Sequence, residues 1–186
     1  YHHIQDHPDL DEMARQRVRY IWSSFWFTYL GEYLPEQKEW HPYTYAKWWK
    51  LGQTMSDDKI NAFVAKMKQA GVATYAYFNV TEYGGDGGKG GDAAAAARAL
   101  RERFANALVK NASGRDIPTW EGAMAMNPGP NYALWPFLVE QVNRHLARLP
   151  DIAGFVIDRL DWASAIDYGH DDGLTMINNK PAENMA

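Results

Sequence analysis

Carboxylates follow apolar segments at several points in this chain, and their chemistry is the first clue to function. Asp158 comes directly after the apolar run 152–157, and Arg159 and Asp161 follow it in the stretch IDRLDW. A carboxylate placed at the end of a buried strand is costly to desolvate unless it is partnered or functional. Arg159 or a neighbouring amide would keep Asp158 ionised, as a nucleophile requires. The pattern indicates that Asp158 is a nucleophile-type catalytic carboxylate.

Two other acidic residues occupy comparable positions. Glu82 lies in FNVTEYGG, after an expected strand at 72–80, and Glu121 lies in TWEG, within a weaker strand candidate at 117–126. Glycoside hydrolysis uses two carboxyl groups, about 5 to 5.5 Å apart for retention and about 6.5 to 9.5 Å apart for inversion. The catalytic partner of Asp158 is therefore Glu82, Glu121 or a residue outside this segment, and the sequence leaves the choice open.

Polar and aromatic residues surround these carboxylates in the sequence. Because the carboxyl ends of parallel strands meet at one edge of a sheet, side chains that follow the strands are expected to line a common site. The candidate substrate-binding residues are Trp26, Asn79, Trp120, Arg159, Asp161, His170 and Asp172.

The segment DYGHDDGLTM (167–176) gathers Asp167, His170, Asp171 and Asp172. Carboxylates with one histidine can bind a hard cation, but the spacing does not match a calcium-loop template. The favoured interpretation is a polar loop over the site, with His170 as a substrate contact or a hydrogen-bonded loop residue. No metal and no cofactor are predicted. The Gly-rich stretch 83–92 lacks the Gly-Lys-Ser/Thr ending of a phosphate loop and is read as a mobile loop.

Strands and helices are expected to alternate along the chain. The expected strands are 17–30, 72–80, 117–126 and 152–158, and the expected helices are 55–71, 92–110 and 134–149. The helix at 55–71 has the clearest signals: Ser56 as N-cap, apolar residues at i, i+3, i+4 and i+7 from Ile60, and Gly71 after its end. The strand at 152–158 is nearly all apolar, as in a parallel strand covered on both faces.

The β-α-β-α-β-α-β order predicts an α/β fold with a parallel sheet and right-handed crossovers. A complete TIM-type barrel needs eight such units and about 250 residues, whereas this sequence holds about four. We therefore expect residues 1–186 to form one (βα)4-like domain, a half or partial TIM-type barrel cut from a larger one. The alternative is a small open doubly wound sheet. The final LTMINNKPAENMA is expected to be a loop leading into an unfinished helix.

The composition indicates which classes of binding partner this protein is expected to have. The 186 residues carry a formal net charge of −4 without a long basic run, so no nucleic-acid partner is expected. No apolar run approaches about 18 residues, so no membrane partner is expected. The chain has 8 Trp and 11 Tyr, which suits a large core and also suits sugar stacking. It has no Cys, which excludes disulfides and thiolate metal sites but does not indicate a compartment.

Three segments together carry a family resemblance: YFNVTEYGG, PTWEGAMAMNPG and GFVIDRLDWASAIDYGHDDGLTM. They resemble the N-terminal half of barrel domains in glycosyl-hydrolase-like proteins related to the α-galactosidase and α-glucosidase superfamily. The resemblance implies a nucleophile at the end of strand four, which is Asp158 here, and an acid/base carboxylate from strand six, which lies beyond this segment. Those enzymes carry Lys or Trp before the nucleophile, where this chain has Ile157.

Two functional hypotheses follow. The first is a carbohydrate-active barrel unit that hydrolyses glycosidic bonds, and the second is a non-catalytic carbohydrate-binding or self-assembling module. A half barrel exposes strand edges and its apolar interior. A homo-oligomer is therefore expected, most simply a dimer in which two halves close one barrel.

Overall fold

The computed structural model describes residues 9–23, 27, 30–40, 54–84, 101–119, 122–158 and 166–185. They belong to two compact units. The first unit comprises Tyr1–Thr28, Glu32–Phe78 and Gln141–Asp158, and the second comprises Tyr29–Gly31, Asn79–Glu140 and Arg159–Ala186. Each unit is described by itself.

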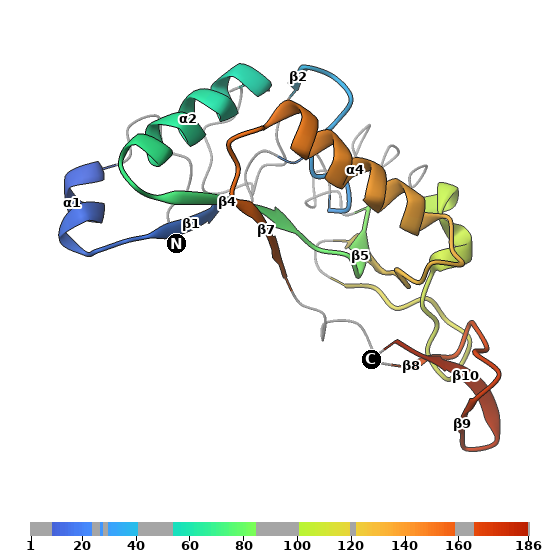
Figure 1. Cartoon of the computed structure of the whole chain (residues 1–186). Helices are drawn as coiled ribbons and strands as arrows, with labels where there is room; N and C mark the ends of the chain where they lie inside the picture. Colours follow the sequence, from blue (N-terminus) through green and yellow to red (C-terminus); the bar gives the residue numbers. More distant parts are fainter. Residues whose placement is uncertain are drawn as a thin grey trace. The chain divides into compact units, whose positions relative to one another are not determined.

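The first unit is built on a three-stranded parallel sheet. Its strands are β1 (Tyr20–Ser23), β4 (Ala73–Phe78) and β7 (Gly154–Ile157), in the order β1-β4-β7 (Figure 1). Both pairings are parallel, which confirms three of the expected strands and their relative direction. Parallel neighbours bring the carboxyl ends of β4 and β7 together, because Ile157 pairs with Phe78.

The helices of this unit follow the sequence signals closely. Helix α2 (Asp57–Gln69) starts after Ser56, whose hydroxyl accepts the Lys59 N–H at 3.3 Å, and Gly71 follows it with a φ of 74°. Helix α4 (Leu134–Arg148) includes Pro136 in its first turn and reaches this unit from Gln141 onward. The sequence did not predict helix α1 (Leu10–Arg15) or the short antiparallel pair β2 (Glu39–Trp40) and β3 (Met55–Ser56).

The two faces of the parallel sheet differ in burial. Ile21, Thr74, Ala76 and Phe78 point to one face and are all under 5% exposed. Ile21 and Ala76 join a core with the apolar face of α2, whose buried side chains are Ile60, Phe63, Val64 and Met67.

The opposite face, called here the aromatic face, carries Tyr20, Trp22, Tyr75, Tyr77 and Val156, of which only Tyr77 is buried. On the other face, Ile157 at the end of β7 is level with Phe78 and is 48% exposed. The expectation that 152–158 is covered on both faces is therefore wrong for the described residues, in which β7 is an edge strand.

In the second unit, the expected third parallel strand at 117–126 was wrong. Residues 117–119 and 123–125 instead run antiparallel to each other, with Thr119 N–H donating to Ala123 O at 2.8 Å. Strand β6 (Met124–Ala125) also pairs antiparallel with β5 (Glu82–Tyr83). Gly122, within the expected strand, has a φ of 83°, a left-handed backbone conformation that glycine adopts readily.

The expected helix at 92–110 ends earlier than predicted. Residues 101–103 are helical, and the chain then tightens into the 3₁₀ turn η1 (Ala105–Ala107). From Leu108 the backbone forms bridges instead, because Val109 N–H donates to Ala125 O and Ile117 N–H donates to Val109 O. Backbone bridges of the kind found in sheets therefore stand where the last part of the helix was expected.

The C-terminal segment is a small antiparallel sheet rather than a loop leading into a helix. Strands β8 (Ile166–Asp167), β9 (Thr175–Ile177) and β10 (Lys180–Asn184) lie in the order β8-β10-β9 (Figure 1). Asn178 and Asn179 join β9 to β10 with φ values of 50° and 61°. Asparagine tolerates this left-handed conformation, which a two-residue type I′ hairpin requires.

The fold is thus mixed α/β, with one parallel three-stranded sheet and several small antiparallel ones. The described strands do not close into a barrel, and their arrangement is compatible with part of one. Among the described helices, none combines the length and apolarity that a membrane span would need.

Candidate functional site

Asp158 lies in the first unit, immediately beyond β7. Its N–H donates to Phe78 O at 2.8 Å, so the parallel register continues to this residue. The alternation of side chains along β7 places Asp158 on the aromatic face, two residues after Val156. There the Tyr77 hydroxyl donates to Oδ2 of Asp158 at 2.8 Å. The half-buried carboxylate therefore sits at the carboxyl end of the sheet, as the sequence predicted.

Aromatic rings hold Tyr77 in place. Its ring stacks on Trp22 at 5.6 Å and on Phe27 at 5.8 Å, and Tyr33 meets it edge-on at 5.9 Å. Rings packed in this way lose little further freedom when they make a directed hydrogen bond. Tyr77 is thus a fixed donor to one oxygen of Asp158, and the arrangement suits a carboxylate that must approach a reacting atom with its other oxygen.

Glu82 and Asn79 form a second polar pair, in the other unit. Asn79 Nδ2 donates to Glu82 Oε2 at 2.6 Å, and both residues are almost fully buried. Asn79 Oδ1 accepts from the Thr81 N–H and hydroxyl, which fixes the amide orientation. Oε1 of Glu82 is buried and has no hydrogen-bond partner among the described residues. A buried carboxyl oxygen without a donor is unusual and keeps Glu82 a candidate for proton transfer.

Half of the residues expected in the site lie outside the described part of the chain. They are Trp26, Trp120, Glu121, Arg159 and Asp161.

His170 takes part in a network within the second unit. Nδ1 lies 2.5 Å from Asp167 Oδ2, and Nε2 lies 2.8 Å from Asn106 O. Both ring nitrogens therefore face acceptor oxygens. Asp167 is fully buried and accepts the N–H groups of Lys110 and Gly169 as well. These contacts anchor the loop that carries His170. A contact between His170 and a substrate is still a prediction.

Asp167, His170 and Glu183 are the group in the described chain whose donor atoms could hold a cation, since these atoms lie within 4.8 Å of one another. Tyr132 donates its hydroxyl to Glu183, and burial, followed by this hydrogen bond, raises the pKa of Tyr132. Metal binding would require a deprotonated His170 nitrogen, whereas both nitrogens face acceptors. These side chains therefore take part in hydrogen bonds within the second unit.

Asp172 has a separate structural environment. Its carboxylate accepts from the Thr175 hydroxyl and from the N–H groups of Thr175, Leu174 and Asn184. The Thr175 hydroxyl is the largest cause of a lowered Asp172 pKa, followed by the backbone donors. These hydrogen bonds hold the turn at residues 172–175 against β10. A contact between Asp172 and a substrate is still a prediction.

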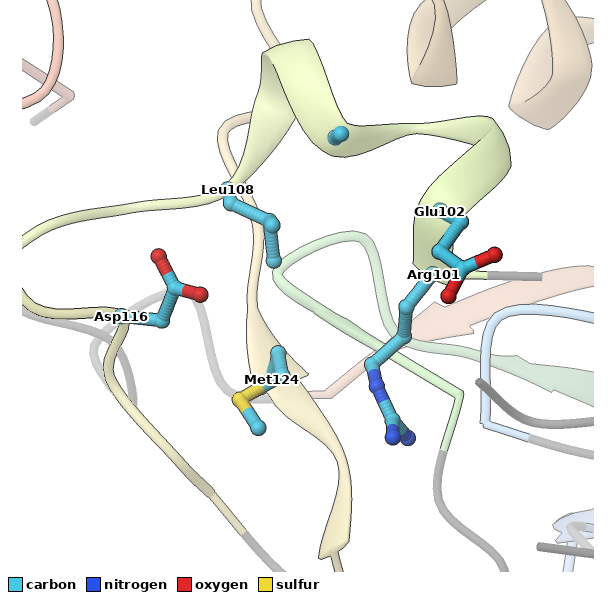
Figure 2. A pocket seen from close by; sticks show the side chains of 6 residues that line it. Arg101, Glu102, Leu108, Asp116 and Met124 are labelled. Carbon is cyan, nitrogen blue, oxygen red and sulfur yellow. The ribbon is translucent and has the colours of Figure 1, made fainter. Parts of the chain in front are cut away.

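A shallow pocket of about 230 Å³ lies elsewhere in the second unit. Figure 2 shows Leu108 and Met124 between Asp116 on one side and Arg101 on the other. Arg101 donates to the carbonyls of Gly84 and Gly122, and Asp116 pairs with Lys110 at 2.5 Å. Arg101 and Asp116 are therefore engaged by other groups of the protein, and among the described residues none that the sequence predicted for the site lines this pocket.

Sequence reasoning missed Tyr77. It lies in YAYF within a correctly predicted strand, and its alternation with Tyr75 was visible. Only the pairing of β4 with β7 reveals that its hydroxyl meets the Asp158 carboxylate.

No protein-family model matches this chain, and no curated protein matches its sequence. Solved structures show partial likeness to this chain, among them the following three. The first is the noncanonic maltogenic α-amylase AmyB from Thermotoga neapolitana, with a TM-score of 0.50 and 10% identity over 83% of this chain and 34% of the amylase. This likeness concerns the fold alone.

The other two are structures of the glycoside hydrolase domain of PelA from Pseudomonas aeruginosa. One has a TM-score of 0.44 and 18% identity, covering 84% of this chain and 42% of that one. The other, variant E218A, has a TM-score of 0.38 and 23% identity, covering 54% and 33%. This chain thus spans less than half the length of each of these three structures. The amylase likeness supports an α/β fold for this chain.

Proposed function

We propose that this chain is a carbohydrate-active unit with glycoside-hydrolase chemistry, in which Asp158 is the nucleophile-type carboxylate. The observation that carries the proposal is the placement of Asp158. It follows a parallel strand, shares a face with four aromatic rings, and receives the Tyr77 hydroxyl at 2.8 Å. Sites of α/β barrels gather at this end of the strands.

In this proposal, one oxygen of Asp158 attacks the anomeric carbon while Tyr77 holds the other. The glycosidic bond then breaks, and a second carboxyl group protonates the leaving oxygen. Water then gives a proton to that second carboxyl group and attacks the anomeric carbon, which breaks the ester bond to Asp158 and releases the sugar. Glu82 and Glu121 remain the candidates for the second carboxyl group, as does a residue outside this segment.

The amylase likeness adds support by analogy. A fold hosts many unrelated chemistries, so a shared fold raises the expectation of carbohydrate chemistry without assigning a substrate. The local chemistry of Asp158 is the stronger argument, because it comes from this chain's own residues.

The test is a turnover assay on a panel of aryl glycosides with wild type and Asp158→Asn. We expect the variant to lose at least about a thousandfold in kcat, because the nucleophile is removed while its shape is kept. Asp151→Asn is the matched control, since Asp151 is a surface residue paired with Lys68. Equal turnover by wild type and Asp158→Asn would refute the assignment.

The non-catalytic carbohydrate-binding module remains the second candidate, favoured by the partial exposure of the aromatic face. Sugar binding without turnover in wild type would select this alternative.

A further inference from the structure

A buried glutamine of helix α4 holds the backbone of the segment between β1 and β2. Oε1 of Gln141 accepts the N–H of Tyr33 at 2.5 Å and the N–H of Leu34 at 3.4 Å. All three residues are fully buried and belong to the first unit. Buried backbone N–H groups require an acceptor, and here one side-chain oxygen serves two of them in succession.

Two arginines of the same helix bind the carbonyls of this segment. Arg144 donates to Leu34 O at 2.7 Å, and Arg148 donates to Pro35 O at 2.5 Å and to Gln37 O at 3.0 Å. The arginines lie three and seven residues after the glutamine, so the three side chains share one face of the helix. Helix α4 therefore fixes the course of the main chain over residues 33–37.

The ring of Tyr33 carries this fixed position toward the candidate site. It lies 4.6 Å from the Phe78 ring and 5.9 Å from the Tyr77 ring, measured between ring centroids. Tyr77 in turn donates its hydroxyl to Asp158. The contacts thus run without interruption from Gln141 through Tyr33 and Tyr77 to the carboxylate.

The angle between the rings shows what Tyr33 adds to the packing of Tyr77. Trp22 and Phe27 stack on Tyr77 with interplanar angles of 26° and 22°. Stacked rings can slide past one another along their planes. The Tyr33 ring is inclined by 66° to that of Tyr77, so it restricts displacement in a different direction.

We propose that Gln141 is a positioning residue for Asp158, acting through Tyr33 and Tyr77. The proposal rests on the proposed function, because Asp158 is the reacting group only there. It goes further by making a buried amide of α4, outside the sheet, part of what orients the nucleophile.

The physical reason is the cost of leaving buried donors without an acceptor. Without the Gln141 oxygen, the N–H groups of Tyr33 and Leu34 lose this hydrogen bond in an environment closed to water. The backbone then shifts to satisfy them, and the Tyr33 ring moves with it. A small displacement of a reacting group is sufficient to slow a reaction strongly.

The first measurement is steady-state kinetics of the full chain on the best aryl glycoside of the panel. Gln141→Met should lower kcat about five- to tenfold and leave KM within about twofold, because it removes the acceptor without touching the sugar. Gln141→Glu keeps an acceptor oxygen at the same place and should restore most of kcat. Asn143→Met, at an exposed position of the same helix, is the matched control and should match wild type.

The second measurement needs no turnover. In a chain labelled with ¹³C at the tyrosine Cζ atoms, NMR follows the exchange of the Tyr77 hydroxyl proton with water. Gln141→Met should speed this exchange about fivefold or more, together with exchange of the Tyr33 amide proton. Gln141→Asn, whose shorter side chain withdraws the acceptor, is the second test variant and should behave in the same way.

The two measurements separate this proposal from the proposed function. No turnover by wild type, combined with faster Tyr77 hydroxyl exchange in Gln141→Met, refutes hydrolysis and supports the positioning of the carboxylate. Faster exchange at the Tyr33 amide alone, with unchanged exchange at the Tyr77 hydroxyl, overturns the proposal, because Gln141 then holds only the segment 33–37. An unchanged kcat in Gln141→Met likewise overturns it.

Discussion

The hydroxyl of Tyr77 donates to Oδ2 of Asp158 at 2.8 Å, from a ring that stacks on Trp22 and on Phe27. The two residues come from neighbouring parallel strands, 81 positions apart in sequence. This hydrogen bond fixes the orientation of the Asp158 carboxylate at the end of its strand. If Asp158 is the nucleophile, Tyr77 is its positioning residue.

Tyr77→Phe should reduce kcat by about ten- to a hundredfold, because a hydrogen bond to a charged group contributes about 1.5–3 kcal/mol. KM should change little, since the ring remains. The measurement is steady-state kinetics on the best aryl glycoside of the panel. Tyr168→Phe is the control, because it removes a tyrosine hydroxyl from the second unit. A kcat of Tyr77→Phe within twofold of wild type would show that the contact does not position the reacting group.

A second prediction concerns the ion pair between Arg148 and Asp57. Arg148 Nε and Nη2 donate to the two carboxylate oxygens at 2.8 and 2.5 Å, and its guanidinium also donates to Pro35 O and Gln37 O. Both side chains are under 20% exposed. The pair joins the last turn of α4 to the first turn of α2, where each charge also suits its helix end.

Arg148→Met should lower the free energy of unfolding by about 3 kcal/mol, because it leaves the Asp57 carboxylate without its partner. Arg148→Lys should restore only part of this loss, since an ammonium cannot reproduce the two-point contact. Chemical denaturation followed by circular dichroism provides the measurement. Asp151→Asn, which breaks an exposed pair with Lys68, should cost less than about 1 kcal/mol. Similar losses in the two variants would contradict the importance of the buried pair.

The third prediction is an acid sensitivity that originates at His145. This side chain is fully buried, packs against Phe78 and Phe155, and contacts Gln141 O through Nδ1. Burial lowers the pKa of His145 to about 4, from an ordinary value of 6.5. Below about pH 6.5 the unfolded chain gains a proton that the folded chain does not, so stability falls as the pH decreases from 6.5 towards 4.

The loss through His145 should reach about 2 kcal/mol between pH 7 and pH 5. His145→Leu removes the titrating group, so its unfolding free energy should depend less on pH by that amount. The measurement is urea denaturation of both chains at pH 7 and pH 5. Identical pH dependence in the two chains would show that His145 does not cause the acid sensitivity.

The local sequence determined much of the first unit. Ser56, the apolar spacing from Ile60 and Gly71 specify α2 through short-range effects, namely a cap, one apolar face and a left-handed end. The apolar runs at 72–80 and 152–158 likewise specified the strands β4 and β7. These features depend on neighbours within a few residues, so a pattern in the chain is sufficient to predict them.

Tertiary structure decided the features that depend on distant partners. The composition of residues 117–126 is typical of one strand. In the structure, residues 117–119 and 123–125 pair antiparallel with each other, and β6 also pairs antiparallel with β5. The Asn178–Asn179 turn could be identified as a hairpin turn only after the structure showed that β9 and β10 lie on either side of it and pair. The contact of Tyr77 with Asp158 likewise required the β4–β7 register. A strand offers the same backbone groups to any neighbour, so its partner and register are set by how the whole chain packs.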